Sequence, residues 1–181
     1  MLLNVGPMGN GKWDAIDVQI FQQIGQWLKK NGKAVYGNKP TGLPVQHWGV
    51  TTKKDDKLYL HVFHWPEDGK IMLHGIDAMP RQAKLLAGGG SVQASRIDNK
   101  NLLIRVPAEC PDSSNAVIEL TLKNGYTVTD TASLLGNENY LLAFDAATEG
   151  GGFTYGDGKK NRHYITDWKN KSQRIFWTVV A

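Results

Sequence analysis

Two adjacent pairs of carboxylates are the candidates in this sequence for a paired general acid and base. They are Asp55-Asp56 and Glu67-Asp68. A general acid needs a pKa raised by burial, and both pairs lie among turn-forming residues where nothing predicts a pocket. We interpret both pairs as solvated turn residues. No Ser-His-Asp order and no phosphate-binding loop stands out, so we assign no catalytic residue.

The histidines and the cysteine do not predict a metal site. His61 and His64 are the only close pair among five histidines. A separation of three in a strand puts two side chains on opposite faces, so this pair cannot chelate one ion there. Cys110 is the only cysteine, which excludes an intrachain disulfide and a cysteine-rich metal site. We expect no metal and no other cofactor.

Aromatic side chains are the remaining candidates for ligand contacts, because sugars stack on flat rings. Trp168 lies in the polar run 167–171 and is the aromatic residue that we most expect to be exposed. Trp65 belongs to an alternating row on one strand face, together with Tyr59, His61 and Phe63. Trp168 and Trp65 are therefore candidate sugar-stacking residues. For both residues we favour the structural alternative, which is a Trp168 folded inward and a covered sheet face under Trp65.

The composition is that of an ordinary folded protein, with 181 residues, 41% hydrophobic and 21% charged. The net charge of +4 suggests nucleic acid, but the basic residues are dispersed. The densest groups, Lys53-Lys54 and Lys159-Lys160, lie in turn-like segments beside aspartates. We therefore expect no nucleic-acid partner. We also expect no membrane partner, since no run approaches the roughly 20 apolar residues of a membrane span. The start lacks the features of a secretory signal, which says little about a longer parent protein.

The clearest predicted element is an amphipathic helix that begins after Asp14. Asp14 is a favourable N-cap, and Asn31-Gly32 is a typical helix stop. Apolar residues recur at helical spacing, namely Ile16, Ile20, Phe21, Ile24, Trp27 and Leu28. We predict that this face is buried. Before the helix, the apolar run 2–5 predicts a buried strand that ends at Gly6-Pro7.

The middle of the chain has the pattern of short strands and turns. Strands are predicted over 48–52, 58–65, 71–74, 92–97, 102–106 and 116–122, with a hairpin connection over 53–57. In the last strand apolar side chains alternate with Val117, Glu119 and Thr121, which predicts a sheet with one solvated face. The pattern predicts a mainly β fold, a small antiparallel β-sandwich.

A third region begins near residue 125. Strands are predicted over 141–144, 152–155, 164–168 and 174–180. Trp177 shares a face with Ile175 and Val179, and we interpret it as a core residue. An apolar strand normally needs neighbours, and this one lies immediately before Ala181. We interpret 125–181 as the start of a further β domain that is incomplete.

Several motifs resemble family 29 glycoside hydrolases, the α-L-fucosidases. The segments 2–7 (LLNVGP), 24–28 (IGQWL) and 31–37 (NGKAVYG) resemble the last strand, helix and exit turn of the catalytic barrel. The segments 51–54 and 57–63 resemble the start of that family's C-terminal β-sandwich. The resemblance covers about residues 1–123, and Lys33 and His64 depart from the usual pattern without touching the catalytic pair.

The resemblance implies a division of the chain and a retaining mechanism. Residues 1–44 would be the end of a truncated (β/α)8 barrel, 45–124 the β-sandwich and 125–181 the further β domain. The Asp nucleophile and Glu acid/base of the family lie on earlier barrel strands, upstream of Met1. The loop after the first strand would lie at the substrate face of the barrel. Met8 and Asn10 are therefore candidate substrate-rim residues, although we favour a purely structural connection for this loop.

We therefore expect a non-catalytic accessory region that is inactive alone. Its parent would hydrolyse terminal α-L-fucosyl residues of glycans without a metal or organic cofactor, and would be secreted or periplasmic. The expected partners are a fucosylated glycan, reached through the parent enzyme, and either the missing catalytic barrel or a second copy by self-association. The alternatives are a free-standing carbohydrate-binding β-sandwich module and a purely structural interaction domain.

Overall fold

The structure is a computed structural model, and its secondary structure is described for most of the chain. The described residues are 5–44, 46–123, 125–128, 132–133, 141, 143, 146–156, 164–177 and 179–180, without side chains at 132–133 and 179–180. The strand predicted over 2–5 falls outside these residues except for Val5. Most of the strand predicted over 141–144 also lies outside them.

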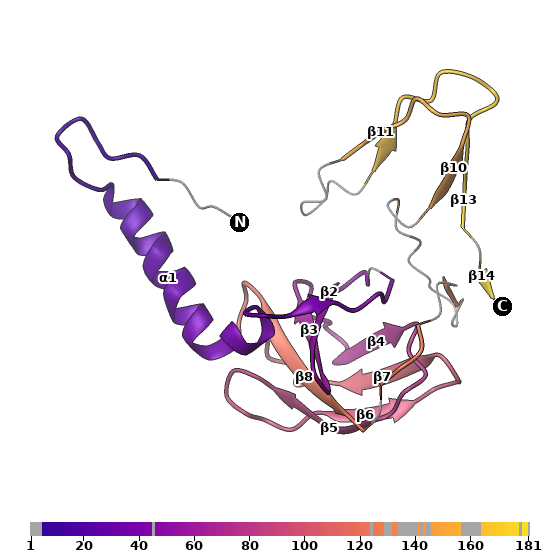
Figure 1. Cartoon of the computed structure of the whole chain (residues 1–181), viewed down its shortest axis with the longest axis horizontal. Helices are drawn as coiled ribbons and strands as arrows, with labels where there is room; N and C mark the ends of the chain where they lie inside the picture. The colour runs from indigo at the N-terminus through magenta and orange to yellow at the C-terminus, as the bar shows by residue number, and fades with distance from the viewer. Residues whose placement is uncertain are drawn as a thin grey trace.

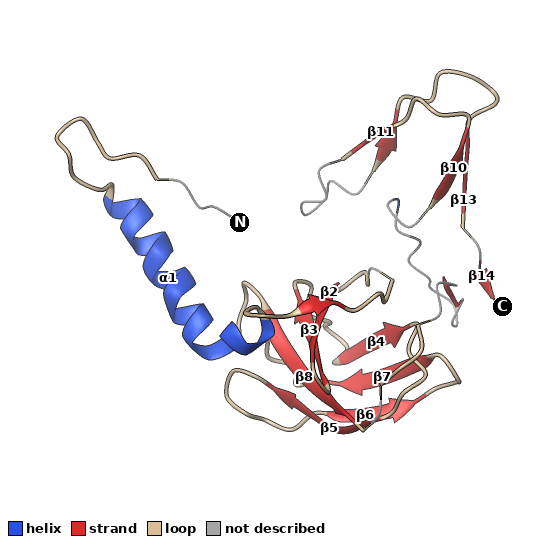
Figure 2. Ribbon diagram, in the orientation of Figure 1, coloured by secondary structure: helices blue, strands red, loops and turns tan. Residues whose placement is uncertain are grey.

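Two antiparallel sheets face each other in the middle of the chain (Figure 1, Figure 2). The larger sheet has the order β1-β2-β3-β8-β5, formed by β1 (Lys39–Pro40), β2 (Gly49–Lys54), β3 (Lys57–Val62), β8 (Ala116–Leu122) and β5 (Pro80–Leu85). The smaller sheet has the order β4-β7-β6, formed by β4 (Lys70–His74), β7 (Asn101–Arg105) and β6 (Gln93–Arg96). The predicted mainly β fold with a small antiparallel sandwich is confirmed.

Aliphatic side chains from both sheets fill the space between them. The larger sheet contributes Leu58, Leu60, Val62, Ile118, Leu120 and Leu122, and the smaller sheet contributes Ile71, Leu73, Leu102 and Ile104. Each such side chain contributes roughly 1.5–3 kcal/mol when it is fully buried. Trp48, only 1% exposed, joins this core, and its indole Nε1 donates a hydrogen bond to the Met72 carbonyl at 2.7 Å. That bond ties the start of β2 to the smaller sheet.

The predicted strands are found with changed ends and one addition. The β2–β3 hairpin turns on Asp55 and Asp56 alone, so its strands run closer to the turn than predicted. β3 ends at Val62 instead of residue 65, because the Trp48 carbonyl accepts hydrogen bonds from the backbone amides of both Phe63 and His64. β5 was not predicted. A register shift between Pro80 and Gln82 interrupts its alternation.

The outer face of the larger sheet is covered where the sequence predicted a solvated face. Val117 and Glu119 of β8 are buried. Val117 forms a second apolar cluster with Ala34 and Tyr59, against which Trp27 packs. The prediction was wrong at Val117 because the end of the N-terminal helix packs there. It was wrong at Glu119, whose carboxylate lies against the ammonium groups of Lys57 and Lys84. Strand alternation contains no information about these neighbours.

Helix α1 (Ala15–Asn31) has the predicted ends and continues into the short 3₁₀ helix η1 (Gly32–Ala34). The Asp14 carboxylate accepts a hydrogen bond from the Ile16 amide at 2.8 Å, as an N-cap does. The predicted burial of its apolar face is wrong for the first half, where Ile16 is 66% and Ile20 46% exposed. Figure 1 shows why, since only the C-terminal end of α1 reaches the sandwich. Within the described residues, no helix is long and apolar enough to cross a membrane.

The C-terminal region contains short paired strands. β10 (Ala147–Glu149) pairs with β13 (Arg174–Phe176), and β11 (Thr154–Tyr155) pairs with β12 (Ile165–Thr166), both antiparallel. β9 (Ala132–Ser133) pairs with β14 (Val179–Val180) in parallel. The predicted strands 152–155, 164–168 and 174–180 are therefore present in shorter form, and the apolar run at 175–180 has strand neighbours.

Candidate functional site

An exposed tryptophan on the C-terminal region is the centre of the candidate site. Trp168 is 55% exposed, so the inward-folded position favoured from the sequence is wrong. The ring of Phe153 meets the indole edge-on, with centroids 5.2 Å apart and planes at 78°. Such T-shaped pairs stabilise by about 0.5–1.5 kcal/mol beyond the apolar area they bury. Phe153 therefore fixes the orientation of an indole that is otherwise open to solvent.

The loop that presents Trp168 is clamped by the buried side chain of Gln173. The Gln173 carbonyl oxygen accepts hydrogen bonds from the backbone amides of Lys169 and Asn170, the latter at 3.0 Å. Its amide group donates to the carbonyls of Gly151 at 2.9 Å and Asp167 at 3.0 Å. Gln173 is 7% exposed, so these four bonds satisfy a buried amide and hold both sides of Trp168 in place.

The residue before the tryptophan has an unusual backbone. Asp167 has a φ of 65°, a left-handed conformation that is uncommon for residues other than glycine. Its carboxylate accepts a hydrogen bond from the Thr154 hydroxyl of β11 and lies 3.7 Å from the Lys169 ammonium. The hydrogen bond from Thr154 and the charge of Lys169 lower the pKa of Asp167. The loop thus holds its shape through specific contacts.

An open hollow of about 570 Å³ lies beside this tryptophan. It is lined by Glu149, Trp168, Arg174, Ile175 and Phe176. Glu149 and Arg174 are cross-strand partners in the β10–β13 pair. Trp168, a carboxylate and a guanidinium therefore line one hollow. This combination can bind a ligand with an apolar face and polar groups at its rim. The sequence identified Trp168 but missed Phe153, Glu149, Arg174 and Gln173, since only the folded chain brings them together.

Trp65, the second candidate stacking residue, is not part of the predicted row. Tyr59 and His61 are buried on the outer face of β3, but the strand ends before Trp65. Trp65 instead packs against the core between the sheets, and its Nε1 donates to the Pro107 carbonyl at 2.9 Å. Phe63 is exposed. The structure therefore favours a mainly structural role for Trp65.

The candidate rim loop is closed by its own hydrogen bonds. The Met8 amide donates to the Lys12 carbonyl, and the Gly11 amide donates to the Met8 carbonyl, both at 2.8 Å. The Asn10 side-chain oxygen accepts from the Lys12 amide at 3.0 Å. Met8 and Asn10 are both exposed. The loop is a compact connection whose side chains remain free to face a partner.

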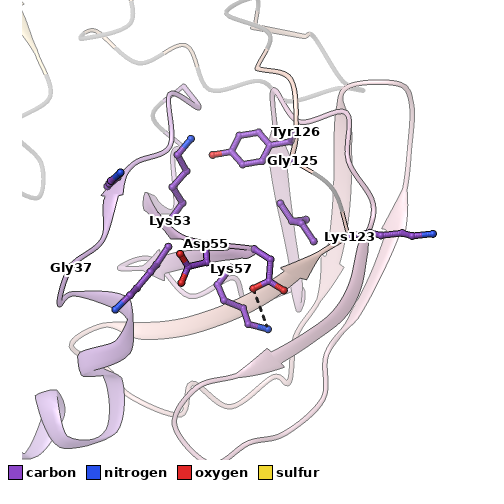
Figure 3. Close-up of a pocket in the computed structure, with 11 residues that line it drawn as sticks. Gly37, Lys53, Asp55, Lys57, Lys123, Gly125 and Tyr126 are labelled. Atoms are coloured by element: carbon purple, nitrogen blue, oxygen red, sulfur yellow. Dashed lines mark ion pairs between the residues drawn. The ribbon is translucent and has the colours of Figure 1, made fainter.

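A second hollow of about 570 Å³ lies beside the β2–β3 turn (Figure 3). Lysines from β1, β2 and β3 line it, namely Lys39, Lys53, Lys54 and Lys57, together with Asp55 and Asp56. The Lys53 ammonium lies 5.2 Å from the centroid of the Tyr126 ring, so that ring already has a cationic partner. Lys123 also lines the hollow, and its side chain extends away from the other labelled residues (Figure 3). We interpret this surface as a solvated turn of mixed charge, as the sequence predicted.

The buried titratable groups have structural partners. Glu119 is the buried carboxylate of the described residues, and it lies 3.4 Å from the Lys84 ammonium and 3.8 Å from that of Lys57. His61 lies between the Thr52 hydroxyl at 3.1 Å and the Asn115 amide at 3.3 Å. The acidic pairs at 55–56 and 67–68 are exposed. Among the described residues, no group of three potential ligands can hold a metal ion.

Sequence comparisons relate this chain to α-L-fucosidases. The α-L-fucosidase family profile matches residues 1–33. Tissue α-L-fucosidase of Macaca fascicularis is 32% identical over 130 residues, which is 67% of this chain and 27% of that protein. The human tissue enzyme is 31% identical with the same coverage. The chain thus spans about 27% of the length of these relatives.

Solved structures give the same result. α-L-fucosidase isoenzyme 1 of Paenibacillus thiaminolyticus has 35% identity and a TM-score of 0.63, covering 68% of this chain and 31% of that one. The α-L-fucosidase of Vibrio sp. strain EJY3 has 28% identity and a TM-score of 0.64, covering 73% and 24%. The fold is therefore that of a β-sandwich region found in glycoside hydrolases. More specifically, the chain is related to the family 29 α-L-fucosidases.

Proposed function

We propose that this chain is the non-catalytic, C-terminal accessory region of an α-L-fucosidase-like glycoside hydrolase. The parent enzyme would remove terminal α-L-fucosyl residues from glycans. One observation carries the proposal: the uncovered apolar face of α1 lies within the segment that the α-L-fucosidase profile matches, residues 1–33. That face needs a partner, and the proposed partner is the catalytic barrel.

The end of α1 is fixed to the sandwich by a chain of polar contacts. The Trp27 indole donates to the Asn115 carbonyl at 2.8 Å, and the Thr52 hydroxyl donates to the Ala34 carbonyl at 2.8 Å. His61 lies between the Thr52 hydroxyl and the Asn115 side chain. These contacts rigidly attach one end of the helix to the larger sheet, so the sandwich can position the remaining face against a neighbour.

That remaining face is strongly apolar. Ile16, Ile20 and Phe21 are all exposed. Full burial of one Ile or Phe side chain contributes roughly 1.5–3 kcal/mol, so a barrel that covers this row would be held firmly. In this proposal residues 1–44 complete the barrel, 45–124 form the sandwich that supports it and 125–181 begin a further β domain. Met8 and Asn10 would then stand at the rim of the barrel, near the substrate.

The proposal leaves catalysis to the barrel. The buried carboxylate of the described residues, Glu119, is paired with lysines and has the environment of a structural anion. We expect no hydrolysis of an aryl α-L-fucoside by this chain alone. Turnover by the chain that is abolished by changing one of its own carboxylates would refute this expectation.

The test has two parts, the upstream gene sequence and a matched pair of variants in the joined protein. The reading frame upstream of the Met1 codon should continue into a barrel, and the joined protein should hydrolyse aryl α-L-fucosides. In that protein, Ile20→Glu should lower stability and activity because it introduces a charge into the contact. Gln22→Glu adds the same charge two residues on, about 200° around the helix, and should change little. Equal effects of the two changes, or an upstream frame without a barrel, would refute the proposal.

A free-standing carbohydrate-binding module is the second candidate function. The exposed Trp168 beside Glu149 and Arg174 favours it, because such a site could act without a barrel. The two functions differ in what covers α1. A free-standing module would stay a monodisperse monomer with the α1 face exposed to solvent, and Ile20→Glu would leave its glycan binding and its stability unchanged.

A further inference from the structure

We propose that the Trp168 loop and the β10–β13 pair form a carbohydrate-contact site. In this site one pyranose ring stacks on the indole, and its hydroxyl groups bond to Glu149 and Arg174. That the ligand is a glycan rests on the proposed function, whereas the location of the site rests on its own geometry. The site lies outside any barrel and would hold the glycan chain instead of hydrolysing it.

The first support is that the tryptophan is presented by a specifically held loop. A side chain this apolar would gain free energy by folding inward. Instead, four hydrogen bonds of the buried Gln173 and the left-handed backbone at Asp167 hold the segment on both sides of Trp168. Strained backbone kept in place by surrounding contacts is common at binding sites. The fixed loop also means that little conformational entropy is lost when a ligand binds.

The second support is the chemistry of the hollow. The C–H groups of a pyranose form an apolar face that matches an indole, and its rim of hydroxyl groups needs hydrogen-bond donors and acceptors. The Glu149 carboxylate supplies acceptors and the Arg174 guanidinium supplies donors in a fixed plane. Neither side chain forms an ion pair within the described part of the chain, and both are exposed. Phe176, which is exposed as well, extends the apolar floor.

The charge of the hollow favours a neutral glycan over a polyanion. Arg174 has Glu149 as its cross-strand partner, and the nearby Lys169 ammonium lies 3.7 Å from the Asp167 carboxylate. The site therefore has no excess of positive charge. A nucleic acid or a heavily sulfated glycan would require a basic groove along its backbone.

The experiment measures binding of defined oligosaccharides to the full chain by calorimetry and ligand-observed NMR. The probes are 2′-fucosyllactose, lactose and cellohexaose, with heparin and single-stranded DNA as polyanions. We expect binding of at least one neutral probe. Trp168→Ala should weaken it about tenfold or more, as removal of a stacking ring does for other flat ligands. Trp168→Phe should restore most of it, and Arg174→Gln should weaken it severalfold.

Trp13→Ala is the matched control, because Trp13 is as exposed as Trp168 but lies before α1. The proposal is overturned if Trp168→Ala binds every neutral probe as tightly as the wild-type protein does. It is also overturned if the wild-type protein binds no neutral probe. Binding restricted to heparin or DNA also overturns it. Circular dichroism of Trp168→Phe and Arg174→Gln separates loss of the site from loss of folding. If the upstream reading frame encodes no barrel but glycan binding still depends on Trp168, the accessory role is refuted and the carbohydrate-contact site is not.

Discussion

Trp27 decides how strongly the helix is attached to the sandwich. Its indole donates to the Asn115 carbonyl at 2.8 Å and packs against Ala34, Tyr59 and Val117. A fully buried Trp that is changed to Ala costs about 3–5 kcal/mol. Trp27 is only partly buried, because the far side of α1 has no cover, so roughly half of that packing is at stake. The lost hydrogen bond adds about 1 kcal/mol. We therefore expect Trp27→Ala to lower the free energy of unfolding by about 2.5–3.5 kcal/mol.

Equilibrium urea unfolding followed by far-ultraviolet circular dichroism measures this change without depending on tryptophan fluorescence. Trp27→Phe keeps most of the packing and loses the hydrogen bond, so it should cost about 1 kcal/mol. Trp13→Ala, at a 59% exposed position, should stay within about 0.5 kcal/mol of the native protein. If Trp27→Ala behaves like Trp13→Ala, the helix is not held by its indole, and the reasoning about its attachment is wrong.

Two further predictions concern the hairpin and the buried histidine. Gly49→Ala should lower the free energy of unfolding in urea by about 3 kcal/mol or more, since the added Cβ would lie 1.9 Å from the His61 carbonyl oxygen. The control, Gly25→Ala, adds a methyl group in open space on α1 and should stabilise the protein by up to about 1 kcal/mol. Equal effects of the two changes would contradict the clash at Gly49. Burial lowers the pKa of His61 below its ordinary 6.5, so the unfolded chain binds more protons and stability should fall as the pH drops below about 6.5. Burial lowers the pKa of His74 in the same direction, so His61→Gln should reduce this pH dependence without abolishing it, and an unchanged slope would refute the role of His61.

The sequence predicted those features of the structure that depend on residues close together in the chain. Asp14 and Asn31-Gly32 predicted the ends of α1, and the run 53–57 predicted a hairpin connection, of which the structure uses only Asp55-Asp56 as the turn. These features depend on capping and turn preferences, which act within a few residues. The alternation in β8 correctly predicted which of its side chains face the core.

The features that the sequence did not predict depend on tertiary contacts. β5 escaped prediction because a register shift interrupts its pattern, and β3 stops short because the Trp48 carbonyl captures two amides beyond Val62. Residues that line the Trp168 site come from segments up to 27 positions apart, and cross-strand pairing alone joins Glu149 to Arg174. A glutamine such as Gln173 gives no sequence signal that it will be buried, since that residue type is mostly exposed.

The sequence by itself determined the fold class and the relationship to α-L-fucosidases, because strand periodicity and short motifs are local and dense. Only the tertiary structure decided which apolar residues are covered. The same helical stripe contains a half-buried Trp27 and an exposed Ile16, and nothing in its spacing separates them. Burial depends on which surface lies opposite each residue, and that surface is supplied by parts of the chain far away in sequence.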